Sequence, residues 1–100
     1  MTGVGAMTPL GADAPSTWAG LLGGRSGARP LDEEGAADLP VRVAAGLTVD
    51  PASLLPRAEA RKLDRGEQVA ILSARGAWQD AGVPRVEPER CAVVSATTPR

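Results

Sequence analysis

Histidine, phenylalanine and tyrosine are absent from this sequence of 100 residues. Without histidine, the Ser-His-Asp and Cys-His arrangements of nucleophilic catalysis are impossible, and the commonest zinc ligand is missing. The single cysteine, Cys91, cannot form an internal disulfide, so a reducing cytoplasm is its natural setting. Cys91 lies near Glu89, has no histidine to activate it and opens a strand-like run, so we predict a structural role. We therefore expect no catalytic residue, metal site or cofactor within this stretch.

Charge of one sign and long apolar runs are also scarce. The 11 basic and 12 acidic residues leave a net charge of −1, which gives no overall field for nucleic acid or an anionic membrane. No run approaches the roughly 18 apolar residues of a membrane span. Residues 1–10 lack the basic start and the long apolar core of a signal peptide. We expect neither nucleic acid nor membrane as a partner.

Large apolar side chains are few. Two tryptophans are the only aromatic residues, and the other apolar side chains are mostly alanine, valine and leucine, which each bury little area. The 12 glycines and 9 prolines are many for a packed domain, yet the apolar runs argue against disorder. The composition therefore predicts an incomplete α/β domain.

The strongest feature is a helical period over residues 63–82. Asp64 is predicted to cap the first turn, with Glu67 completing a capping box, and Gly82 to end the helix. Gly76 weakens the helix without an evident reason. One face is small and apolar and the opposite face is polar: Leu63, Ala70, Ala74, Ala77, Trp78 and Ala81 against Asp64, Gln68, Arg75 and Gln79. The alanine-rich face suits packing against a sheet.

Two shorter segments come first. Residues 1–11 are predicted to be the end of a strand entering a glycine-rich turn, in which the glycines adopt positive φ. Thr8 stands where a dinucleotide-binding fingerprint needs glycine, which argues against a Rossmann site. Residues 13–24 predict a short helix capped by Asp13. Its apolar face, expected to be core, comprises Trp18, Leu21 and Leu22.

The middle and the end of the sequence predict loops and strands. Residues 25–40 are predicted to be a surface loop, whose carboxylates are simply solvated: Asp32, Glu33 and Glu34. Alternating apolar side chains over residues 41–49 predict a strand, and Asp50 then caps a short helical turn. Residues 91–97 are β-branched and follow a helix, which favours a parallel strand.

A basic stub occupies residues 57–62. Arg57, Arg61 and Arg65 recur at four-residue spacing, so a helix would place them on one face. The simplest interpretation is a solvated face whose charges pair with Glu59.

In order, these pieces are TGVGAMTPLG, STWAGLLGGRSG, LPVRVAAGL, ARKLDRGEQVAILSARGAWQDAG and a final parallel strand. Together they resemble the N-terminal part of the β-ketoacyl-[acyl carrier protein] synthases of the type II elongating class, with polyketide ketosynthases a close second. The resemblance runs from Met1 to about Ser95. On this basis residues 1–100 are expected to form a partial synthase N-terminal domain.

The resemblance implies an α/β, thiolase-like fold with helices packed on a mixed five-stranded sheet. Such enzymes condense an acyl thioester with malonyl groups on acyl carrier protein, and act as cytoplasmic homodimers. Their nucleophilic cysteine and two histidines lie beyond the position that corresponds to residue 100. Their basic patch for the acidic carrier protein matches Arg61 and Lys62, with Arg57 adjacent.

Two departures and two alternatives accompany this interpretation. The family's first strand is largely missing before Thr2, and the end of the sequence differs from the glycine-rich segment of the family. We therefore expect an N-terminal fragment that is inactive alone. The alternatives are a fragment of a polyketide ketosynthase, and a non-catalytic piece that binds carrier protein or dimerises with a synthase.

Overall fold

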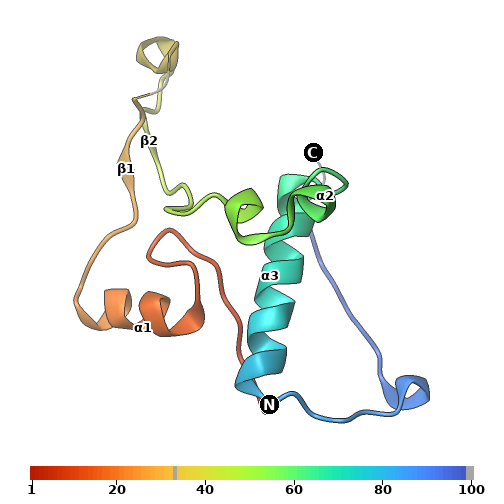
Figure 1. The fold of residues 1–100 in the computed structure, drawn as a ribbon. Helices are drawn as coiled ribbons and strands as arrows, with labels where there is room; N and C mark the ends of the chain where they lie inside the picture. Colours follow the sequence, from red (N-terminus) through yellow and green to blue (C-terminus); the bar gives the residue numbers. More distant parts are fainter. Residues whose placement is uncertain (33, 99–100) are drawn as a thin grey trace.

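The computed structural model describes residues 1–32 and 34–98, which form a small α/β unit (Figure 1). Glu33 of the predicted acidic run and the divergent end at residues 99–100 lie outside the described residues. The elements are α1 (Ala14–Leu22), β1 (Arg29–Pro30), η1 (Ala36–Asp38), β2 (Val43–Ala44), η2 (Pro51–Leu54), α2 (Arg57–Ala60), α3 (Arg65–Asp80) and η3 (Pro88–Arg90).

The long helix α3 begins and ends as predicted. The Asp64 carboxylate accepts a hydrogen bond from the Glu67 backbone N–H at 2.9 Å, and the Glu67 carboxylate accepts one from the Asp64 N–H at 2.9 Å. Gly82 follows the helix with φ of 84°, a conformation that glycine adopts without a steric penalty. The ends of α3 were predicted correctly because each capping interaction depends on groups within a few residues of the helix end.

The predicted faces of α3 are only partly correct. Ala77 and Ala81 of the predicted apolar face are half-buried and lie under the N-terminal segment, but Ala74 and Trp78 of the same face are exposed, and Gln68, assigned to the polar face, is 8% exposed. The elements that cover α3 are η2 and the N-terminal segment. The helical period located the helix correctly, but the covered face depends on which segments are available to pack.

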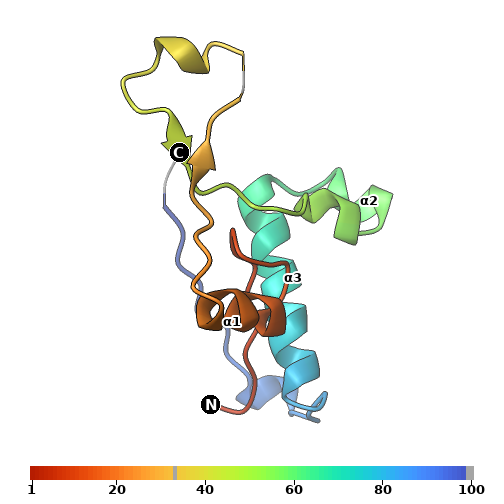
Figure 2. The ribbon, with the colours of Figure 1, turned by 90° about the vertical axis from the view of Figure 1, so that its left-hand side faces the viewer.

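The N-terminal segment, residues 1–7, runs along α3 (Figures 1 and 2), and the chain then enters the predicted turn, where Thr8 and Gly11 exchange backbone hydrogen bonds at 2.9 and 3.1 Å. Gly3 and Gly5 do not have positive φ, which corrects the predicted role of these glycines. A β-carbon at Gly5 would overlap the carbonyl oxygen of Ser73, and one at Gly3 would overlap that of Ala77. Glycine is needed here for backbone-to-backbone approach.

Gly76 lies on the helix side of the same contact. A β-carbon at Gly76 would lie 3.6 Å from the α-carbon of Gly5, so the helix surface here is covered by the N-terminal backbone. The Val4 N–H also donates to the Asp80 carboxylate at 2.9 Å and fixes the segment near the end of α3.

Helix α1 confirms the cap but not the core face. The Asp13 carboxylate accepts from the Ser16 N–H at 2.8 Å, and the Asp13 N–H donates to the Ser16 hydroxyl at 3.3 Å, which makes a capping box. Trp18, Leu21 and Leu22, predicted to be core, are 61%, 57% and 70% exposed. No described element packs on this face, so the amphipathic pattern has no apolar partner within these residues.

The cap of α1 should depend on pH. Hydrogen bonds from Ser16 hold the pKa of Asp13 below its ordinary value of 3.8, so the capping contribution is complete above pH 3.8 and is lost as pH falls through the lower folded-state pKa. We expect the amides of Ser16 and Thr17 to exchange faster in acid, as measured by NMR. Asp13→Asn, a cap that does not titrate, should remove this dependence; an unchanged profile in the variant would contradict the assignment.

The predicted sheet is largely absent from the described residues. The strand predicted over 41–49 shrinks to Val43–Ala44, which pairs antiparallel with β1 in the segment predicted to be a loop. Residues 91–97, predicted to be a parallel strand, are extended but unpaired, with Val93 and Val94 at 89% and 96% exposed. A strand requires neighbouring backbone to bond, and no described segment lies in position to supply it.

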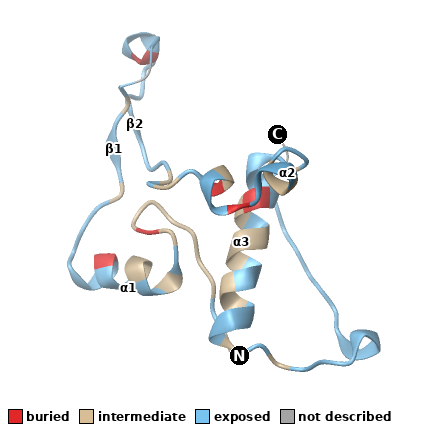
Figure 3. Ribbon diagram, viewed as in Figure 1, coloured by how far each residue is buried: buried red, intermediate tan, exposed pale blue. Residues whose placement is uncertain are grey.

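Few side chains leave water. Ala36 and Leu55 are the buried apolar residues of the described part, Pro51 is buried four residues before Leu55, and the buried sites are scattered (Figure 3). The radius of gyration is 16.2 Å, against about 13 Å for a compact domain of this length. The β1–β2 hairpin projects away from the helices (Figure 2). None of the described helices combines the length and the apolar character needed to cross a bilayer.

Candidate functional site

The basic stub forms a single helical turn with its cations outward. Pro56 precedes α2, and its carbonyl accepts from the Ala60 N–H at 2.9 Å, while the Arg57 carbonyl accepts from the Arg61 N–H at 3.2 Å. Lys62 follows in the turn that leads to α3. Arg57, Arg61 and Lys62 are all exposed, and Arg57 and Arg61 line the same pocket. We call these three side chains the basic face.

The basic face is not paired with Glu59, contrary to the simplest interpretation of the sequence. Glu59 instead forms an ion pair with Arg75 of α3, with 2.7 Å between the guanidinium and the carboxylate. This pair turns the one acidic side chain of α2 toward α3. Arg57, Arg61 and Lys62 therefore have no acidic partner among the described residues.

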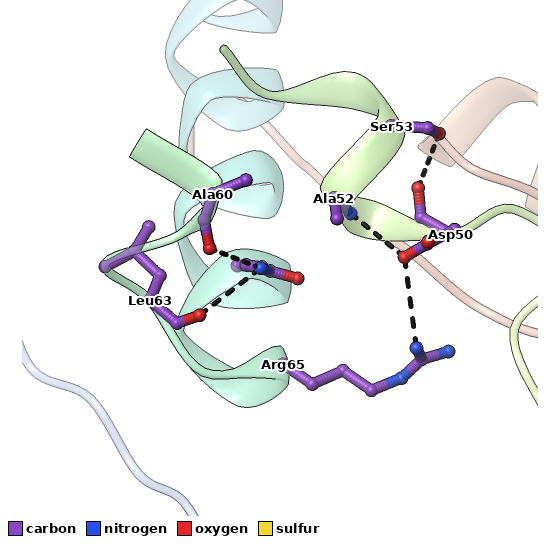
Figure 4. A network of polar contacts seen from close by, with 7 residues as sticks. Asp50, Ala52, Ser53, Ala60, Leu63 and Arg65 are labelled. Carbon is purple, nitrogen blue, oxygen red and sulfur yellow. Dashed lines mark hydrogen bonds and ion pairs between the residues drawn. The ribbon is translucent and has the colours of Figure 1, made fainter. Parts of the chain in front are cut away.

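Arg65 is separate from the basic face, although its spacing placed it there. The chain leaves α2 at Ala60 and starts α3 at Arg65, so the four-residue spacing does not continue along one helix. Arg65 lies 3.9 Å from the carboxylate of Asp50, which also caps η2 by accepting from the Ala52 N–H at 3.1 Å (Figure 4). Asp50 thus links η2 to the start of α3.

One buried amide joins α2 to α3. The Gln68 side-chain Nε2 donates to the Ala60 carbonyl at 3.0 Å and to the Leu63 carbonyl at 3.3 Å, both drawn in Figure 4. The sequence did not predict a role for Gln68, because its position on the helix indicated a solvated side. A glutamine one turn after a helix cap, close to a preceding short helix, was the available signal.

The arrangement has the chemistry of a docking surface. A pocket between η2 and α2 is lined by apolar and small side chains together with Asp50, Arg57 and Arg61. No group of three or more metal-ligating side chains gathers within residues 1–32 and 34–98. Cys91, predicted to open a strand, instead follows η3 as a free, exposed thiol. Exposed side chains of one charge sign are suited to contact an acidic partner.

The family comparison covers the whole sequence. The family model for the β-ketoacyl synthase N-terminal domain matches residues 1–100. The chain belongs to the β-ketoacyl synthase family. This confirms the resemblance drawn from the residues, and it covers the glycine-rich N-terminal segment, α3 and the basic face alike.

Individual relatives agree with this membership. The chain is 39% identical to the 3-oxoacyl-[acyl-carrier-protein] synthase 2 of Coxiella burnetii over 84 residues, which cover 83% of this chain and 20% of that protein. It is 34% identical to the enzyme of the same name from Mycobacterium bovis over 99 residues, which cover 97% and 24%. The ketoacyl synthase alpha subunit of the tetracenomycin polyketide synthase of Streptomyces glaucescens is 36% identical over 101 residues, with the same coverage. This member of the β-ketoacyl synthase family thus spans a fifth to a quarter of the length of these relatives.

Proposed function

We propose that this chain is the N-terminal part of a 3-oxoacyl-[acyl-carrier-protein] synthase, which condenses acyl thioesters with malonyl-acyl carrier protein in fatty-acid elongation. Within it, residues 1–100 provide carrier-protein docking and no catalytic group. The observation that carries the docking role is the basic face, whose three exposed cations lack acidic partners among the described residues, in a chain that the family model matches throughout. The absence of histidine supports the view that this stretch contributes no catalytic base.

The physical basis of docking is electrostatic steering. Arg57, Arg61 and Lys62 lie within two helical turns of sequence, so their fields add at an acidic surface within about 10 Å, the screening length at 0.1 M salt. Exposed charges of this kind raise the association rate and set orientation more than they hold the complex. A weak, fast complex is what a carrier protein that visits several enzymes requires.

The thiolase-like sheet, the homodimer and the cytoplasmic setting belong to the same proposal. The unpaired residues 91–97 and the exposed apolar face of α1 support it, because both present surface that a larger fold would cover. In this proposal the five-stranded sheet is completed by segments of the synthase other than those described.

A polyketide ketosynthase is the second candidate, favoured by the 36% identity to the tetracenomycin alpha subunit. A piece that only binds carrier protein or dimerises with a synthase is the third. Titration with fatty-acid and polyketide carrier proteins separates the first two. The third is favoured only if the chain binds carrier protein but shows no condensing activity when it is in a complex with a synthase.

Charge reversal tests the proposal. We expect Arg61→Glu with Lys62→Glu to raise the Kd for holo-acyl carrier protein by about tenfold to a hundredfold at low salt, because two attractions become repulsions. The measurement is calorimetric titration of the chain at two salt concentrations. The affinity of the unmodified chain should fall with salt, and the variant should lose most of this dependence.

Arg85→Glu is the matched control, because Arg85 is exposed beyond the opposite end of α3. It changes the net charge in the same direction without touching the basic face. Equal weakening by Arg85→Glu would mean that only net charge matters, and an unchanged Kd in the double variant would refute docking at this face.

A further inference from the structure

We infer that Gln68 is the positioning residue of the basic face, which rests on the proposed docking function. Gln68 touches no carrier protein in this proposal. It acts by fixing the backbone from which Arg61 and Lys62 project.

The first support is burial. Among the described residues, Gln68 is the buried polar side chain, at 8% exposure, although its neighbours Glu67 and Arg65 on α3 are exposed. A buried amide costs free energy unless its hydrogen bonds are made. The Gln68 Nε2 donates two hydrogen bonds, and both go to backbone carbonyls outside α3.

The second support is the location of the acceptors. Ala60 ends α2 and Leu63 immediately precedes the cap of α3, so the two carbonyls bracket Arg61 and Lys62. The Ala60 carbonyl also accepts a long hydrogen bond from the Leu63 N–H, at 3.4 Å, so the Gln68 amide adds to the backbone bonding of this turn. The Gln68 amide supplies hydrogen bonds to both, and therefore clamps each end of the two-residue stretch that carries the cations.

The third support is the charge distribution around the turn that Gln68 holds. The Glu59–Arg75 pair anchors α2 to α3 and turns the acidic side chain of α2 toward α3, and the exposed Asp50–Arg65 contact is a weaker anchor between η2 and α3. Gln68 holds the turn between these anchors with a neutral group. The turn is thus fixed without adding a negative charge beside Arg61 and Lys62.

Losing the clamp should weaken docking without changing charge. Gln68→Met keeps the length and volume of the side chain but cannot donate, so the turn keeps only its backbone hydrogen bonds and holds Arg61 and Lys62 less firmly. We expect the Kd for holo-acyl carrier protein to rise about threefold to tenfold. The salt dependence of binding should remain that of the unmodified chain, because all the charges are still present.

A double-variant cycle separates positioning from a general structural role. In an Arg61→Gln, Lys62→Gln background, Gln68→Met should have no further effect on the Kd, because the side chains it positions are already neutral. A structural residue would instead weaken binding equally in both backgrounds. Gln79→Met, the same change at an exposed position near the end of α3, is the control and should bind normally.

Gln68→Asn keeps the amide but is one methylene shorter, so it reaches at most one carbonyl and should give an intermediate Kd. It also serves if Gln68→Met loses the helical circular dichroism of α3. A normal Kd in both variants, while charge reversal at Arg61 and Lys62 abolishes binding, would overturn the inference and leave the docking function standing. If charge reversal itself changes nothing, the docking function fails first.

Discussion

Replacing Gly5 by valine should detach residues 1–7 from α3 and lower the free energy of unfolding by about 3 kcal/mol. The β-carbon alone would overlap the Ser73 carbonyl oxygen and lie 2.7 Å from the Ala77 backbone nitrogen. Both atoms belong to the helix backbone, which cannot move aside as a flexible side chain would. The Val4–Asp80 hydrogen bond, which depends on the same approach, should be lost with it.

Urea unfolding monitored by circular dichroism measures this effect, and NMR of the Val4 amide reports the detachment. Gly46→Ala is the control, since a β-carbon there meets nothing within 4 Å. Gly76→Ala, on the helix side of the same contact, should stabilise α3 by about 1 kcal/mol because its β-carbon meets the Gly5 α-carbon at an ordinary 3.6 Å. If Gly5→Val unfolds at the urea concentration of the unmodified chain, the close approach is not present in solution.

Replacing Leu55 by alanine should release η2 from α3 and cost about 2–3 kcal/mol. Leu55 is 7% exposed and follows η2, the element that packs on α3, so its side chain is a large part of a very small core. Since α2 begins two residues after Leu55, loosening η2 should also raise the Kd for carrier protein.

Leu54→Ala is the closest control that the chain offers. Leu54 has the same side chain at the adjacent position but is 49% exposed, so its truncation should cost well under half as much. Urea unfolding of the two variants side by side provides the comparison. Equal effects would show that burial of Leu55 against α3 does not hold η2 in place.

The elements that the sequence predicted correctly are those whose causes are local. The caps of α1 and α3 follow from Asp13 and Asp64 with their partners three residues on, and η2 follows from Asp50 and Pro51. The basic face was predictable for the same reason, because Arg57, Arg61 and Lys62 are close in sequence and remain close in any turn. Family membership also followed from the order of short motifs along the chain.

The predictions from the sequence were wrong where the local structure or burial depends on segments that are distant in the chain. Trp18 was predicted to be core from its amphipathic pattern, and residues 91–97 to be a strand, but both need partners that no described residue supplies. Gln68 was misassigned to a solvated side of α3 because the segments that cover the helix, residues 1–7 and η2, come from elsewhere in the chain.

By itself, the sequence determined where the helices begin and end and which family the chain belongs to. It also determined that the chain carries a basic stub and that it has no histidine for catalysis. Only the tertiary structure decided that Glu59 turns to Arg75, that Arg65 leaves the basic face for Asp50, and that Gln68 is buried against two carbonyls. The physical reason is range: capping and turn preferences act over three or four residues, whereas ion pairs and burial depend on which parts of the folded chain meet.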